Sequence, residues 1–142
     1  MKTGLAAHDI QKENDKYLVS YETKDWFKFW RNHNYIYTRQ SEGPVYVFTS
    51  IFAPTELNIE VFHRWKYYDN TSDKWITQDD IGFEITGGRN GGYRGYTYKN
   101  NIWNGKWKVE VITSEELTLG VVNFKIIDGS NNQSPKLIKR RF

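Results

Sequence analysis

Arginine and tyrosine share strand faces at two places in the chain, and these positions carry its clearest capacity for binding chemistry. Arg64 and Tyr68 fall on the polar face of an alternating segment. Arg94, Tyr96 and Tyr98 share one face of a later segment with the same period of two. Tyrosine rings stack on the apolar faces of sugars, and a guanidinium binds a carboxylate or a sulfate through two hydrogen bonds. The same residue types are enriched at protein-binding hot spots.

Two further positions extend this candidate surface. Glycines surround Arg89 in residues 87–92, and we expect a binding loop there, because a strand follows and phosphate loops lead into a helix. Trp103 falls outside any clean alternation and is a candidate for exposure. In the alternative interpretation, the tyrosines pack in a second sheet and the arginines pair with Glu60 or Glu84. The candidate ligand-binding residues are Arg64, Tyr68, Arg89, Arg94, Tyr96, Tyr98 and Trp103.

Residue types that usually carry catalysis or bind metals are sparse. The chain has no Cys, and its three His occur singly, without the local pairing of zinc sites. His63 shares a strand face with apolar residues, which indicates a half-buried histidine with satisfied hydrogen bonds. Adjacent carboxylates such as Asp79 and Asp80 point to opposite strand faces, so they do not form the facing pair of a glycosidase. The oxygen-rich residues 69–73 suit a turn better than a calcium site. We therefore expect no enzymatic activity, no metal site and no cofactor.

Composition and charge narrow the class of protein further. The 142 residues suit one domain, and 17% of them are aromatic, which favours strands. The net charge at pH 7 is +3, but four basic residues and no acid lie in residues 135–142, so the rest of the chain carries −1. A nearly neutral body disfavours a nucleic-acid partner. No apolar run reaches the roughly 18 residues that a membrane-spanning helix needs.

The elements that must position the candidate residues are short strands separated by turns. Residues 45–52, 58–68 and 117–127 are the strongest strand segments, and Asn104-Gly105 predicts a tight hairpin. We predict an all-β fold, a two-sheet antiparallel β-sandwich of immunoglobulin or fibronectin-III type with about seven or eight strands.

The expected domain organisation is simple. Residues 1–15 are polar and lack periodicity, which predicts a loose lead-in. A single β-sandwich domain is expected over residues 16–128. A polar and basic tail is expected over residues 129–142, solvated at the end of the chain.

Three spaced motifs lie on these strands: His63-Arg64-Trp65, Tyr93-Arg94-Gly95-Tyr96, and the segment Gly105 to Val111. Over about residues 43–127 this pattern resembles the bacterial "domain of unknown function 2914" family, in the form found in Bacteroidetes-type bacteria. In such relatives the domain often ends a membrane-embedded protein. The resemblance therefore implies the soluble part of a larger protein of the bacterial cell envelope. Membrane contact would then run only through a covalently linked region outside this chain. The resemblance supplies no catalytic residue.

These observations favour a non-catalytic binding or interaction module. The preferred ligand is a carbohydrate or another cell-envelope polymer, held by the Arg/Tyr/Trp surface. A protein partner is the main alternative. A small polysaccharide-acting enzyme that uses Tyr, His and Arg is a weaker hypothesis, and so is a single-stranded nucleic-acid binder with exposed aromatic residues.

Overall fold

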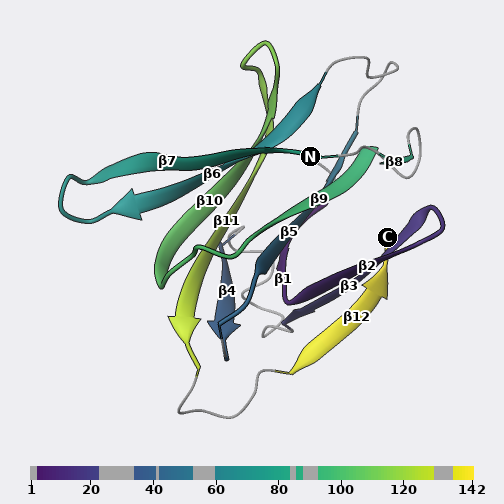
Figure 1. The fold of residues 1–142 in the computed structure, drawn as a ribbon, viewed down its shortest axis with the longest axis horizontal. Helices are drawn as coiled ribbons and strands as arrows, with labels where there is room; N and C mark the ends of the chain where they lie inside the picture. Colours follow the sequence, from purple (N-terminus) through teal and green to yellow (C-terminus); the bar gives the residue numbers. More distant parts are fainter. Residues whose placement is uncertain are drawn as a thin grey trace.

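The structure of the chain is a computed structural model. It describes residues 3–22, 34–40, 42–52, 60–83, 86–87, 93–129 and 136–142. Every regular element in these ranges is a β-strand (Figure 1), so the predicted all-β class is confirmed. The strands are β1 (Thr3–Ala7), β2 (Asp9–Glu13), β3 (Lys16–Glu22), β4 (Asn34–Arg39), β5 (Val45–Ile51), β6 (Val61–Asp69), β7 (Lys74–Gly82), β8 (Thr86–Gly87), β9 (Tyr93–Lys99), β10 (Gly105–Thr113), β11 (Thr118–Asp128) and β12 (Leu137–Arg141).

The strands form three sheets. A central sheet has the order β1-β5-β9-β8, and all its neighbours are antiparallel. A five-stranded sheet has the order β4-β11-β10-β6-β7, in which β4 runs parallel to β11. A small sheet has the order β12-β3-β2. The expected antiparallel arrangement therefore has one parallel exception, and the described strands outnumber the seven or eight that we predicted.

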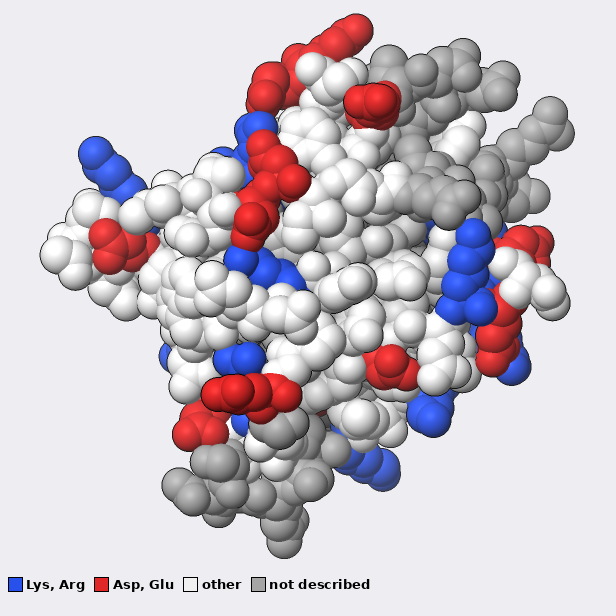
Figure 2. Space-filling view, viewed as in Figure 1, with Lys and Arg blue, Asp and Glu red and all other residues white. Residues whose placement is uncertain are grey.

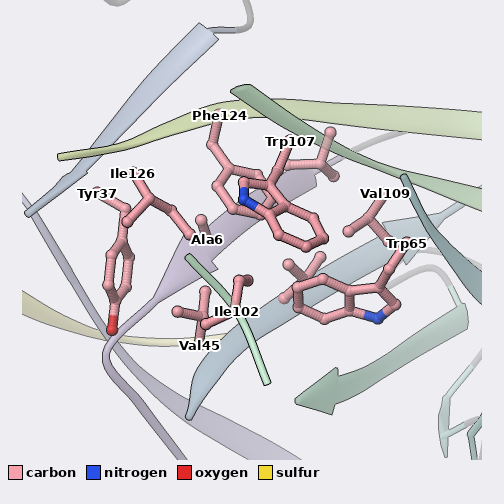
Figure 3. Close-up of a cluster of buried hydrophobic side chains, with 11 residues drawn as sticks. Ala6, Tyr37, Val45, Trp65, Ile102, Trp107, Val109, Phe124 and Ile126 are labelled. Carbon is pink, nitrogen blue, oxygen red and sulfur yellow. The ribbon is translucent and has the colours of Figure 1, made fainter. Parts of the chain in front are cut away.

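The main core lies between the central sheet and the five-stranded sheet (Figure 3). Strand alternation turns one apolar face of each sheet toward the other, and burial of large apolar side chains stabilises the fold by about 1.5–3 kcal/mol each. Trp65 and Trp107 are its largest members, and both are fully buried. The cluster comprises Ala6, Tyr37, Val45, Val47, Trp65, Ile102, Trp107, Val109, Val122, Phe124 and Ile126.

The opposite face of the central sheet is also covered. There, Leu5, Ala7 and Phe48 pack against side chains of the small sheet. The small sheet contributes buried apolar residues from β2 and β3, with Tyr17 the largest of them. The central sheet is therefore buried on both faces, which explains why β5 carries apolar residues at consecutive positions.

Both ends of the chain depart from the sequence prediction. Residues 1–15, expected as a loose lead-in, contain β1 and β2. The tail, expected to be solvated, contains β12, which pairs with β3, and Phe142 exchanges backbone hydrogen bonds with Tyr17. These segments lack a strong pattern of their own. Their strands are stabilised by partners distant in sequence, which explains why local periodicity did not predict them.

The predicted hairpin at Asn104-Gly105 is also corrected. The flanking strands β9 and β10 belong to different sheets, so this segment crosses between sheets instead of closing a hairpin. Gly105 has a φ of 129°, and a Cβ at this position would lie 2.9 Å from Cε1 of Tyr67. Glycine is required here by the positive φ and by the close approach of the Tyr67 ring.

Candidate functional site: a tyrosine groove

A groove opens at one edge of the central sheet, close to the end of β7 and the β2–β3 hairpin. Its volume is about 480 Å³, which is within the range of small-ligand sites in proteins. Figure 2 shows an uncharged area near the middle of this face, with acidic and basic side chains around it. The tyrosine groove, as we call it, is lined by Lys12, Tyr17, Ile81, Gly82, Phe83, Tyr96, Thr97 and Tyr98.

Four tyrosine rings gather around this groove. In the antiparallel pair β5–β9, Tyr46 lies directly opposite Tyr98, and their ring centroids are 5.5 Å apart. The ring of Tyr96 lies 6.1 Å from that of Tyr46 and 5.8 Å from that of Tyr17, which comes from β3. At these separations aromatic rings attract one another. The register of β5 and β9, together with the docking of the small sheet, therefore assembles the cluster.

The exposure of the rings increases from the floor of the groove to its mouth. Tyr17 is buried, with 2% of its surface exposed. Tyr96 is half-buried, and Tyr98 is 51% exposed. Much of the Tyr98 ring is therefore accessible to a ligand, while the more buried rings of Tyr17 and Tyr96 form the wall and floor of the groove.

Polar groups complete the groove. The Lys12 ammonium lies 5.8 Å from the centroid of the Tyr17 ring, within range of a cation–π interaction. Burial raises the pKa of the Tyr46 hydroxyl, and the nearby carboxylate of Asp9 and the other tyrosines add to the shift. The Tyr46 hydroxyl therefore stays protonated at neutral pH and keeps its hydrogen-bond donor. The described groups of the groove offer aromatic faces, hydroxyls and one ammonium.

Four of the residues predicted for ligand binding lie within residues 93–103, and they differ in exposure and in their contacts. Tyr96 and Tyr98 line the tyrosine groove. Arg94 lies on the same strand but is only 9% exposed. Trp103 joins the edge of the main core, where its ring lies 4.9 Å from that of Trp107.

The predicted residue Arg89 lies outside the described residues, and so does Glu84, which was considered as an arginine partner.

Arg64 and Tyr68 lie on a different surface, the outer face of the five-stranded sheet. Arg64 Nε donates to Asp80 at 2.9 Å, and Arg64 Nη1 donates to Glu116 at 2.8 Å. The Glu116 and Asp80 carboxylates raise the pKa of Arg64, and Arg64 in turn lowers the pKa of Glu116. The guanidinium therefore already holds two carboxylates, neither of which is the Glu60 considered from sequence. The Tyr68 ring lies 5.2 Å from that of Trp75.

His63 is fully buried between the two larger sheets, instead of half-buried as predicted. Its Nε2 lies 2.9 Å from Thr49 Oγ1, and its Nδ1 lies 2.7 Å from Thr97 Oγ1. Trp65 Nε1 donates to the same Thr97 hydroxyl at 3.1 Å. Burial lowers the pKa of His63 to about 3, so the imidazole is neutral at pH 7. Both ring nitrogens are satisfied, and the histidine joins the sheets through hydrogen bonds.

The oxygen-rich turn has a structural explanation. Asp69 accepts hydrogen bonds from the Ser72 hydroxyl at 2.8 Å and from the Thr71 backbone amide at 3.3 Å. These bonds lower the pKa of Asp69 and are typical of Asx turns. Within the described ranges, no group of three or more His, Asp or Glu side chains is arranged to hold a metal ion.

The sequence analysis missed the groove residues Lys12 and Tyr17, and also Tyr46, whose ring packs against Tyr96 and Tyr98 beside the groove. Alternation indicates the strand face of Tyr17 and Tyr46, but it does not indicate which other strand lies beside them. Lys12 belongs to the segment expected to be a loose lead-in. Only the pairing of β5 with β9 and the docking of the small sheet bring these residues to Tyr96.

The comparisons with known proteins concern the segment that begins just before β6 and ends within β11. Residues 58–126 match the sequence model of the family described as protein of unknown function (DUF2914). The resemblance predicted from the motifs is thereby confirmed over this segment.

No curated protein matches the chain. The DUF2914 segment contains β6 to β10 and most of β11, and with them Tyr96 and Tyr98. Lys12, Tyr17 and Tyr46 lie outside it, so the tyrosine groove combines family and non-family segments. The described residues include no helix that is long and apolar enough to cross a bilayer.

Proposed function

We propose that this protein is a non-catalytic module that binds a carbohydrate chain in the tyrosine groove. The observation that carries the proposal is the exposed ring of Tyr98, two residues from the half-buried Tyr96 on the same face of β9, in a groove of about 480 Å³. Sugars present apolar C–H faces that stack on such rings, and their hydroxyls pair with the Tyr and Lys groups nearby.

The setting in the cell belongs to the same proposal. The DUF2914 resemblance supports a bacterial protein of the cell envelope, with any membrane attachment through a linked region outside this chain. An immunoglobulin-type sandwich, made by the central and five-stranded sheets, is the structural part of the proposal, and the small sheet is an addition to it. The face-to-face core between the two larger sheets supports this assignment.

A protein partner is the second candidate, and one observation favours it. In the described part of the chain, β12 forms an edge of the small sheet, and Leu137 and Ile138 are 43% and 39% exposed there. An edge strand with exposed apolar side chains suits the addition of a strand from another protein.

The test is isothermal titration calorimetry with neutral oligosaccharides of cellulose, xylan and chitin type. We expect one of them to bind the wild type and the Tyr98→Ala variant to bind it at least about tenfold more weakly, equivalent to about 1.4 kcal/mol. Tyr98 is half exposed, so the variant should keep its thermal unfolding midpoint. Phe52→Ala is the matched control, because it removes a ring that is 62% exposed and does not line the groove.

Two outcomes would contradict the proposal. The first is that none of the oligosaccharides binds the wild type. The second is that Tyr98→Ala and Phe52→Ala weaken binding equally, which would place the ligand elsewhere.

A further inference from the structure

The outer face of the five-stranded sheet carries lysines opposite one another. Lys106 on β10 is the cross-strand partner of Lys125 on β11. Lys108, two residues further along β10, is the partner of Lys66 on β6. Residues two apart on a strand share a face, so the four lysines form two neighbouring rows across three strands.

This arrangement is unfavourable for folding. Directly opposite residues have Cβ atoms about 4.5–5.5 Å apart, and like charges at that separation destabilise a sheet. One of the four charges is neutralised, because Lys66 Nζ lies 2.7 Å from Glu110 Oε1. Lys106, Lys108 and Lys125 form no ion pair within the described ranges.

Two aromatic rings lie among these lysines. The Lys106 ammonium is 5.3 Å from the centroid of the Tyr68 ring, and the Lys108 ammonium is 4.5 Å from that of Trp75. Both contacts are cation–π interactions, which orient the ammonium groups on the sheet but leave their charge in place. Lys106 and Lys125 are exposed.

Acidic side chains lie beside the lysine rows at one end, so the positively charged area is narrow. Glu110 lies two residues beyond Lys108 on β10, about 7 Å along the strand. Its cross-strand partner Arg64 forms ion pairs with the carboxylates of Asp80 and Glu116. The distance between Lys108 and Glu110 is within the Debye length of about 8 Å at physiological salt. A broad anionic partner, such as a bilayer or a nucleic-acid duplex, would meet these carboxylates, whereas a narrow chain along the lysine rows would avoid them.

We propose that this lysine face, formed by Lys106, Lys108 and Lys125 with the rings of Tyr68 and Trp75, binds a linear acidic polysaccharide. Carboxylate or sulfate groups on the polymer offset the repulsion between the lysines, and the two rings supply apolar contact for the sugar units. The lysine face and the tyrosine groove share no residue, so a negative result for one binding proposal leaves the other standing.

The test compares two triple variants that lose the same charge from different surfaces. The first variant is Lys106→Gln, Lys108→Gln and Lys125→Gln. The control is Lys136→Gln, Lys139→Gln and Arg140→Gln, at exposed positions at and beside β12. Calorimetry with polygalacturonate and dextran sulfate measures binding at low and high NaCl, with neutral dextran as the uncharged polymer.

We expect the wild type to bind one of the two anionic polymers and to bind neutral dextran at least tenfold more weakly. The lysine-face variant should lose at least tenfold in affinity, the control variant less than threefold, and Tyr98→Ala should bind as the wild type does. Separately, Lys125→Gln should raise the thermal unfolding midpoint, because it removes a like-charge pair. We therefore expect loss of these lysines to make the fold more stable and to weaken polymer binding, as is typical of residues that serve binding at the expense of stability.

Other results would overturn the proposal. Equal losses in both triple variants would show that only the overall charge matters. Failure of the wild type to bind either polymer would remove the polysaccharide as ligand. Equal or tighter binding of polyglutamate, of phosphatidylglycerol vesicles or of single-stranded DNA would assign the surface to a different class of partner.

Discussion

Acidification should destabilise this protein through His63, which is held neutral in the folded state. Burial lowers its pKa from 6.5 to about 3. Between these values the unfolded chain binds a proton that the folded protein rejects, so the free energy of unfolding falls as the pH falls. Well above pH 6.5 both states are neutral at this position, and the contribution no longer changes with pH.

The magnitude follows from the width of that window. One pKa unit corresponds to about 1.4 kcal/mol. Lowering the pH from 7.0 to 4.5 should therefore cost about 3 kcal/mol through His63 alone, and lowering it to pH 3 about 4 kcal/mol, because the folded state is itself half protonated there. Single domains have total stabilities of only about 5–15 kcal/mol, so the loss is large enough to measure.

The assay is urea unfolding followed by tryptophan fluorescence at pH 7.0 and 4.5. The informative variant is His63→Gln, whose amide keeps a donor and an acceptor near Thr49 and Thr97 but does not titrate. We expect this variant to be less stable than the wild type at pH 7 and to lose about 3 kcal/mol less on acidification. His8→Gln is the matched control, since His8 is only partly buried and pairs with Glu22.

Two results would refute the reasoning. If the wild type and His63→Gln lose the same free energy between pH 7.0 and 4.5, the buried imidazole does not control the acid response. If His8→Gln removes the pH dependence instead, the response comes from the His8–Glu22 pair. Titration of carboxylates is common to the wild type and His63→Gln and cancels in their comparison.

Two further substitutions test the interior. Thr97→Val should cost about 1–3 kcal/mol in urea unfolding, because it removes the hydrogen-bond partner of both His63 and Trp65; an unchanged midpoint would contradict the assigned network. Gly105→Ala should lower the thermal unfolding midpoint by several degrees, because its Cβ would clash with Tyr67 at a positive φ. A neutral Gly105→Ala variant would show that the crossing between sheets tolerates a side chain.

Much of the fold could be predicted where alternation is strong. In β6, alternation puts Val61, His63 and Trp65 on one strand face, and all three are buried. The aromatic content and the turn residues predicted an all-β chain. By contrast, β1 and β2 escaped prediction because a short, mixed segment becomes a strand only when a partner such as β5 or β3 supplies the hydrogen bonds.

The candidate site was predicted in part, for a related reason. Alternation places Tyr96 and Tyr98 on one face of β9, but it does not distinguish an open face from a covered one. On that face Tyr98 is 51% exposed and Arg94 only 9%, while the ring of Tyr96 packs against Tyr17 of the small sheet. On the five-stranded sheet, Arg64 meets Glu116 across a separation in sequence that no local pattern records.

The sequence by itself determined the class of secondary structure, the inward and outward faces of the strong strands, and the resemblance to DUF2914. These properties depend on residue type and on a period of two, which are local. The tertiary structure alone decided which faces meet. It brought Tyr17 from β3 to Tyr96 on β9, and it placed Lys106 beside Lys125. Such pairings are set by register and sheet docking, which depend on the whole chain at once.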